Sequence, residues 1–136
     1  MPQRIQWEPG YGVGHALIDE QHQGLLNQCN LLAEQCLTEG DAACDSRFDQ
    51  IFERLQALAR EHFETETALL ARWGYAELED HRVACDEFAY LVDEVVTTEN
   101  FSRVELQRFL ALWWVGHIAG SAAQQRALLA GRDTPA

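Results

Sequence analysis

The sequence lacks any apolar run near the roughly 20 residues that a membrane-spanning helix requires, and its start, MPQRIQWEPG, lacks the apolar core of a signal peptide. Lysine and arginine are scarce as well. The chain has ten lysines and arginines against 22 aspartates and glutamates, which gives a formal net charge of −12. Because this charge repels phosphate backbones and anionic lipids, we expect neither a nucleic-acid nor a membrane partner. We expect a cytoplasmic protein.

Cysteine pairs of the CxxC type are also absent. Four separate cysteines, Cys29, Cys36, Cys44 and Cys85, do not form a disulfide framework in a chain of 136 residues, so we expect reduced thiols. Hydrophobic residues make up 47% and charged residues 24% of the chain, which are ordinary values for a folded globular protein. We find no repeat or low-complexity tract, and we predict a single domain over residues 1–136.

Helical periodicity is what the sequence does contain. Apolar residues recur at spacings of three and four in four blocks, and no block alternates with period two over strand length. The blocks begin near Ile18, Ser46, Leu78 and Ser102, and the glycines that follow three of them, Gly40, Gly74 and Gly131, are typical of positions just beyond a helix end. Short connections favour antiparallel neighbours. We therefore predict an all-α, up-down-up-down four-helix bundle over residues 18–130, with an irregular arm at 1–17 and a tail at 131–136.

Each apolar stripe contains one histidine, and the second stripe also contains a glutamate. These residues are His22, His62, Glu66, His81 and His117. A lone histidine on an apolar face is usually a hydrogen-bonded core residue, because burying an unpaired ionisable group is costly. Four histidines on four facing helices instead favour a metal site. The spacing of four between His62 and Glu66, and between His81 and Cys85, places each pair on one helix face, and these donors suit ferrous iron or zinc.

Four segments occur in a specific order: Trp7 followed by IDEQH at 18–22, HFETE at 62–66, GYAELEDH at 74–81, and WWVGHI at 113–118. Together they resemble the bacteriohemerythrins of the hemerythrin-like HHE cation-binding family, non-haem proteins that bind dioxygen at a two-iron centre. The resemblance covers nearly the whole chain. It implies that His22 and His62 serve one iron, that His81 and His117 serve the other, and that Glu66 bridges them. It also implies that Trp113 lines the dioxygen pocket.

Two positions depart from the family pattern, which has a histidine four residues after His81 and an aspartate five residues after His117. This sequence has Cys85 and Ala122 there. Ala122 cannot coordinate a metal, whereas an ionised Cys85 is a good ligand and would keep the charge of the ligand set at about −2. We predict a modified two-iron site with the ligands His22, His62, Glu66, His81, Cys85 and His117.

Two alternatives stay open. One is a single zinc or iron held by His81, Cys85 and His117, with a redox-sensing or structural role. The other is a bundle without metal that acts as an interaction module. We favour a protein that binds or senses dioxygen or a related small ligand over an enzyme, because the sequence shows no separate acid, base or substrate pocket. A sensor of this kind would act through a separate protein partner.

Overall fold

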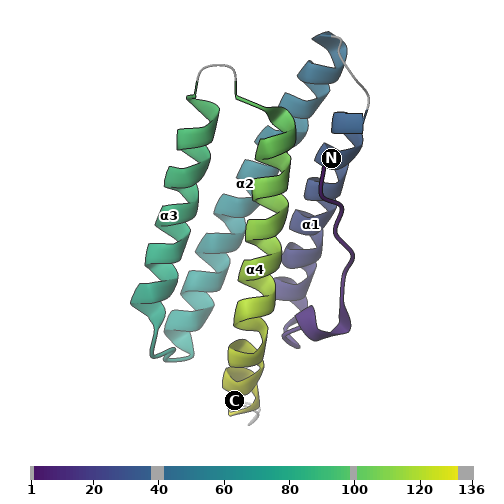
Figure 1. The fold of residues 1–136 in the computed structure, drawn as a ribbon. Coiled ribbons are helices and arrows are strands. Elements are labelled where there is room, and N and C mark those ends of the chain that lie inside the picture. The colour runs from purple at the N-terminus through teal and green to yellow at the C-terminus, as the bar shows by residue number, and fades with distance from the viewer. Residues whose placement is uncertain (1, 38–41, 99–100, 132–136) are drawn as a thin grey trace.

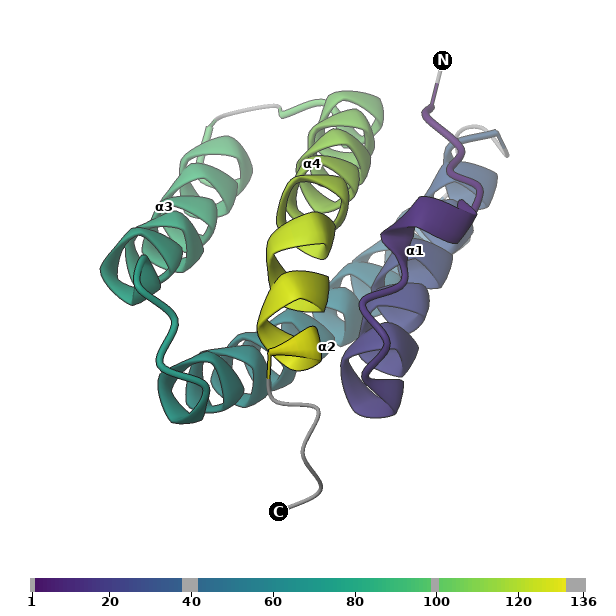
Figure 2. The same ribbon diagram turned by 90° about the horizontal axis from the view of Figure 1, so that it is seen from below.

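The computed structural model describes residues 2–37, 42–98 and 101–131. In these ranges the chain forms a 3-10 turn, η1 (Pro9–Tyr11), and four helices without a strand: α1 (Ala16–Leu37), α2 (Ala42–Arg72), α3 (Leu78–Val96) and α4 (Arg103–Ala130). Consecutive helices run antiparallel (Figure 1). Seen along the bundle, α1 and α3 lie on opposite sides, with α2 and α4 between them (Figure 2). The predicted all-α four-helix bundle is confirmed.

Local signals explain where the helices begin and end. The hydroxyl oxygen of Ser102 accepts a hydrogen bond from the Glu105 amide, which makes Ser102 the predicted N-cap of α4. Gly74 ends α2 with a φ of 69°, where the amides of Gly74 and Tyr75 donate to the carbonyl oxygens of Ala71 and Leu70 in a Schellman motif.

The predicted start of the second helix at Ser46 is wrong, since α2 begins at Ala42. Two alanines, the strongest helix formers, extend the helix by one turn ahead of the serine. The first helix begins two residues before the predicted Ile18, at Ala16, and its predicted stop at Gly40 lies outside the described residues. None of the helices in the described ranges combines the length and apolarity needed to cross a bilayer.

The helices bury their apolar stripes in two clusters. The larger cluster contains Leu25, Leu55, Leu110 and Trp114, all fully buried, and the smaller one is built on Val13, Ile18 and Ala122. On α1, the buried His22 falls between Ile18 of the smaller cluster and Leu25 of the larger one. The polar residues therefore interrupt the core at one level of the bundle, where they are shielded from water on both sides.

The N-terminal arm is held to the bundle by two side-chain amides that imitate backbone pairing. Asn30 of α1 accepts from the amide of Ile5 (2.8 Å) and donates to its carbonyl oxygen (2.7 Å). Gln107 of α4, fully buried, accepts from the amide of Gln3 and donates to its carbonyl oxygen, both at 2.7 Å, and also donates to Cys29 at 3.0 Å. These amides fix the arm across α1 and α4.

We predict that Gln107→Ala lowers the free energy of unfolding by about 1–3 kcal/mol, because it removes three hydrogen bonds and leaves the buried Cys29 carbonyl oxygen without this donor. Urea unfolding measures the loss, and faster hydrogen exchange at the Gln3 amide reports detachment of the arm. Gln23→Ala, at an exposed position of α1, is the control. Equal stability of the two variants would contradict the role of Gln107.

Candidate metal centre

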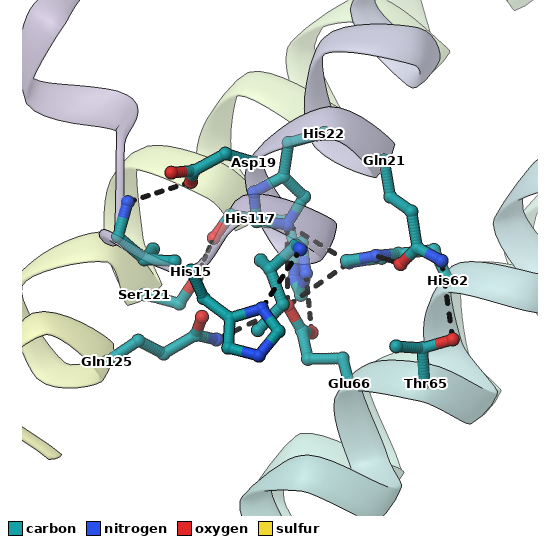
Figure 3. Close-up of polar contacts among 12 residues, drawn as sticks. His15, Asp19, Gln21, His22, His62, Thr65, Glu66, His117, Ser121 and Gln125 are labelled. Carbon is teal, nitrogen blue, oxygen red and sulfur yellow. Dashed lines mark hydrogen bonds and ion pairs between the residues drawn. The ribbon is translucent and has the colours of Figure 1, made fainter. Parts of the chain in front are cut away.

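Glu66 of α2 lies fully buried among imidazoles from all four helices, and Figure 3 shows those of His22, His62 and His117 around it. Its Oε2 atom lies 3.3 Å from Nε2 of His22 and 3.1 Å from Nε2 of His62. Its Oε1 atom lies 3.0 Å from Nε2 of His117 and 3.6 Å from Nε2 of His81. Each carboxylate oxygen thus faces its own pair of histidines, and these are the pairs that the family resemblance assigned to two separate ions.

The spacing of the donor atoms fits a metal ion. Nε2 of His22 lies 3.0 Å from Nε2 of His62, and one donor atom from each of His22, His62, Glu66 and His117 lies within 4.8 Å of the others. Adjacent ligands of an octahedral ion are about 3.0 Å apart when each metal–nitrogen bond is about 2.1 Å. Four of the predicted ligands therefore converge at coordination spacing.

Gln21 fixes the proton of one imidazole. Its Oε1 atom lies 2.9 Å from Nδ1 of His62, while its amide nitrogen donates to the Thr65 hydroxyl. A neutral His62 that donates from Nδ1 presents the lone pair of Nε2 to the cluster, as a metal ligand must. Nδ1 of His22 is buried without a hydrogen-bond partner among the described residues. Only one of these two rings is therefore held in the ligand tautomer by a neighbour.

The protonation states also suit a cation. Burial by itself would raise the pKa of Glu66, but the charge on His117 and hydrogen bonds from His117, His22 and His62 hold it well below its usual range. Burial lowers the pKa of His62 and of His81, and this outweighs the attraction of Glu66. At neutral pH the cluster therefore offers an ionised carboxylate and at least two neutral imidazoles, so a metal ion would not have to displace protons from them.

His81 and Cys85 form the outer edge of the cluster. Sγ of Cys85 lies 3.6 Å from Nε2 of His81, and that nitrogen also lies 3.1 Å from the Thr67 hydroxyl. Burial, together with the charges of Glu66 and Asp86, raises the pKa of Cys85 to about 12. The thiolate on which the expected charge of about −2 depends is thus a neutral thiol in the metal-free protein. A metal ion would have to displace its proton.

Aromatic rings cover the α4 side of the cluster. Trp113 stacks on His117 with ring centroids 5.1 Å apart and an interplanar angle of 9°. Trp114 is fully buried, and its ring centroid lies 5.5 Å from that of His117 and 5.8 Å from that of His62. The ring of Phe63 stacks on the ring of Trp114. Of these three aromatic residues, only Trp113 was predicted to line the site. Phe63 lies three residues before Glu66, and Trp114 lies three residues before His117, so helical spacing was the signal that could have included them.

Two amides near the predicted ligands were not predicted as site residues. Gln21 precedes His22 in the chain, and Gln125 of α4 is buried with its Nε2 atom 3.2 Å from Oε2 of Glu66. Gln125 lies eight positions after His117, on the same helix face, but its neutral side chain carries no ligand signature. Ala122, at the position of the missing aspartate, is buried beside Val13 and Ile18.

The chain matches the hemerythrin HHE cation binding domain over residues 13–122 and belongs to this family. It is 23% identical to a myohemerythrin of Theromyzon tessulatum over 89% of this chain and 90% of that protein. It is 23% identical to a hemerythrin-like protein of Naegleria gruberi, covering 95% of this chain and 97% of that one. It is 25% identical to hemerythrin subunit 1 of Golfingia vulgaris, covering 87% of each. A comparison with solved structures gives no significant match. The predicted family is confirmed, and the chain is a hemerythrin-like cation-binding domain.

The lowered pKa of His62 predicts that the metal-free protein loses stability as the pH falls below 6.5, its ordinary value. In that range the unfolded chain binds a proton on this residue and the folded chain does not, so stability is greatest above pH 6.5 and falls by up to about 1.4 kcal/mol per pH unit. Urea unfolding between pH 7 and 5 measures the slope. We expect a shallower slope for His62→Gln and an unchanged one for Gln23→Ala, an exposed change that removes no titratable group. A slope that His62→Gln leaves unaltered would contradict this assignment.

Proposed function

We propose that this protein binds iron at a two-metal site bridged by Glu66, and that it binds or senses dioxygen or a related small ligand there. The observation that carries the proposal is the division of the Glu66 oxygens. One faces His22 and His62, and the other faces His81 and His117. A carboxylate placed between two pairs of imidazoles has the donor geometry of a bridge.

In this proposal His22 and His62 hold one ion and His81 and His117 hold the other, with Cys85 as a further ligand. Bound iron would supply a redox-active ion with open coordination positions for a small ligand. The protein supplies the surroundings. The rings of Trp113 and Trp114 keep water from the inner face of His117, while the side chains of His81 and His117 keep 8% exposure. This edge of the site is where a small ligand would enter.

One specific observation favours a second candidate function, in which the site holds a single metal ion. The tightest donor group in the described residues is His22, His62, Glu66 and His117, which excludes Cys85. A single ion would therefore bind inside this group rather than at the site of His81, Cys85 and His117 that the sequence left open. Loss of metal in His22→Ala but not in Cys85→Ser, with one ion per chain in the wild type, would support this occupancy.

We predict that anaerobically purified protein holds about two irons per chain and changes its visible absorption on exposure to air. Glu66→Gln keeps the size of the side chain but removes the bridging charge, so we expect loss of at least one of the two irons. Elemental analysis paired with absorption spectra measures both. Glu64→Gln, an exposed glutamate of α2, should load as the wild type does. A wild type that takes up no metal after careful reconstitution would refute the proposal.

Cys85→Ser tests the thiol ligand. If Cys85 binds ferric iron as a thiolate, the variant should lose the sulfur-to-iron charge-transfer absorption and shift its reduction potential, because a hydroxyl is a poorer donor than a thiolate. Cys36→Ser, a half-buried cysteine of α1, is the matched control. Visible spectra and potentials that stay the same in Cys85→Ser would remove Cys85 from the ligand set.

We also propose that the protein works in the cytoplasm. The described cysteines, Cys29, Cys36 and Cys85, are all free, as is usual in a reducing compartment. Fractionation of cells that express the native gene tests the location, and recovery of the chain with secreted proteins would contradict it.

A further inference from the structure

Within the described parts of the chain, the side chain of Gln125 is the one polar contact of Glu66 that the histidine pattern does not explain. Gln125 is 2% exposed, and its Nε2 atom donates to Oε2 of Glu66 at 3.2 Å (Figure 3). Its Oε1 atom is buried without a hydrogen-bond partner among the described residues. Burying a carbonyl oxygen without a donor is unfavourable, so packing alone gives no reason for an amide here.

The register of α4 explains how this residue reaches the cluster. Ala122 occupies the position of the missing aspartate, and Gln125 follows it by about one turn. Side chains on a helix lean towards its N-terminus, so a long side chain at 125 covers the level at which a shorter one at 122 would end. Ser121 does not compete for this space, because its hydroxyl donates to the carbonyl oxygen of His117 at 2.7 Å.

We propose that Gln125 is a positioning residue that takes the place of the absent second carboxylate. It holds the Oε2 atom of Glu66 towards the Nε2 atoms of His22 and His62 and contributes no charge of its own. This inference rests on the proposed metal site. The half of the site that contains His22 and His62 then has one carboxylate, Glu66, hydrogen-bonded to the neutral amide of Gln125. The family pattern has two carboxylates there.

The charge of this arrangement has a consequence for the bound ion. Gln125 is neutral where the family pattern has an aspartate, so Glu66 is the one carboxylate among the described residues of the donor group. A site with fewer negative charges stabilises a bound cation less, and this loss is larger for a trivalent ion than for a divalent one. Compared with a carboxylate at the same place, the neutral Gln125 therefore favours the ferrous over the ferric state.

Two substitutions of Gln125 distinguish a role in positioning Glu66 from a role in core packing alone. Gln125→Met keeps length and volume but removes the hydrogen bond, and we expect ferrous affinity to fall about 10- to 100-fold, as for other outer partners of metal ligands. Gln125→Glu keeps the length and adds a carboxylate beside Glu66. We expect it to lower the stability of the metal-free protein, increase the stabilisation gained on adding iron, and lower the reduction potential of the loaded protein.

The experiment measures ferrous binding by anaerobic chelator competition, thermal unfolding with and without iron, and the potential of the loaded protein. The controls are Gln124→Met and Gln124→Glu, because Gln124 is an exposed neighbour whose Oε1 atom accepts a hydrogen bond from the Tyr75 hydroxyl (2.7 Å), away from Glu66. Wild-type affinity in Gln125→Met, or an unchanged potential in Gln125→Glu, would overturn the role of Gln125 while leaving the metal site intact.

If the wild type binds no iron, the proposed function fails, and the metal-free protein decides the positioning role separately. NMR signals of the His22 and His62 ring nitrogens should then shift in Gln125→Met and stay in place in Gln124→Met, because reorienting Oε2 of Glu66 changes the hydrogen bonds of both rings. Ring signals that do not respond to Gln125→Met would overturn the inference.

Discussion

The ionised carboxylate of Glu66 contacts imidazoles from all four helices at the level where the apolar core is interrupted. A buried carboxylate is tolerated only when its oxygens are well satisfied, and His22, His62 and His117 supply hydrogen bonds that hold it charged. The histidines in turn depend on Glu66 for a partner. Such a network acts as a unit, because removing one member takes a hydrogen-bond partner from several of the others.

The two halves of the site differ in how firmly they are held. His22 and His62 are fully buried, and Gln21 and Gln125 support this half from either side. On the other half His81 lies 3.6 Å from Glu66 and closer to the Thr67 hydroxyl, with the Cys85 thiol at its edge. The residues from α1 and α2 are therefore held more firmly than those from α3, where the Cys85 thiol would have to lose its proton before it could bind a metal ion.

Much of this was open to prediction, because helical spacing is a local property. Repeats of three and four residues placed His62 and Glu66 on one face of α2, and His117 on the inner face of α4, before any packing was known. Ser102 and Gly74 likewise marked helix ends through contacts within a few residues. Ser46 did not, since the preceding alanines carry the helix back to Ala42.

The sequence by itself determined the four helices, the family, and the histidines and glutamate that meet in the core, because their types and intervals are written along single helices. Only the tertiary structure decided which Glu66 oxygen faces which histidines, that Gln125 reaches the level of Ala122, and that burial raises the pKa of Cys85 in the metal-free protein. Those features depend on the direction of long side chains and on the depth of burial. Both are set by residues from other helices, which no pattern within one helix encodes.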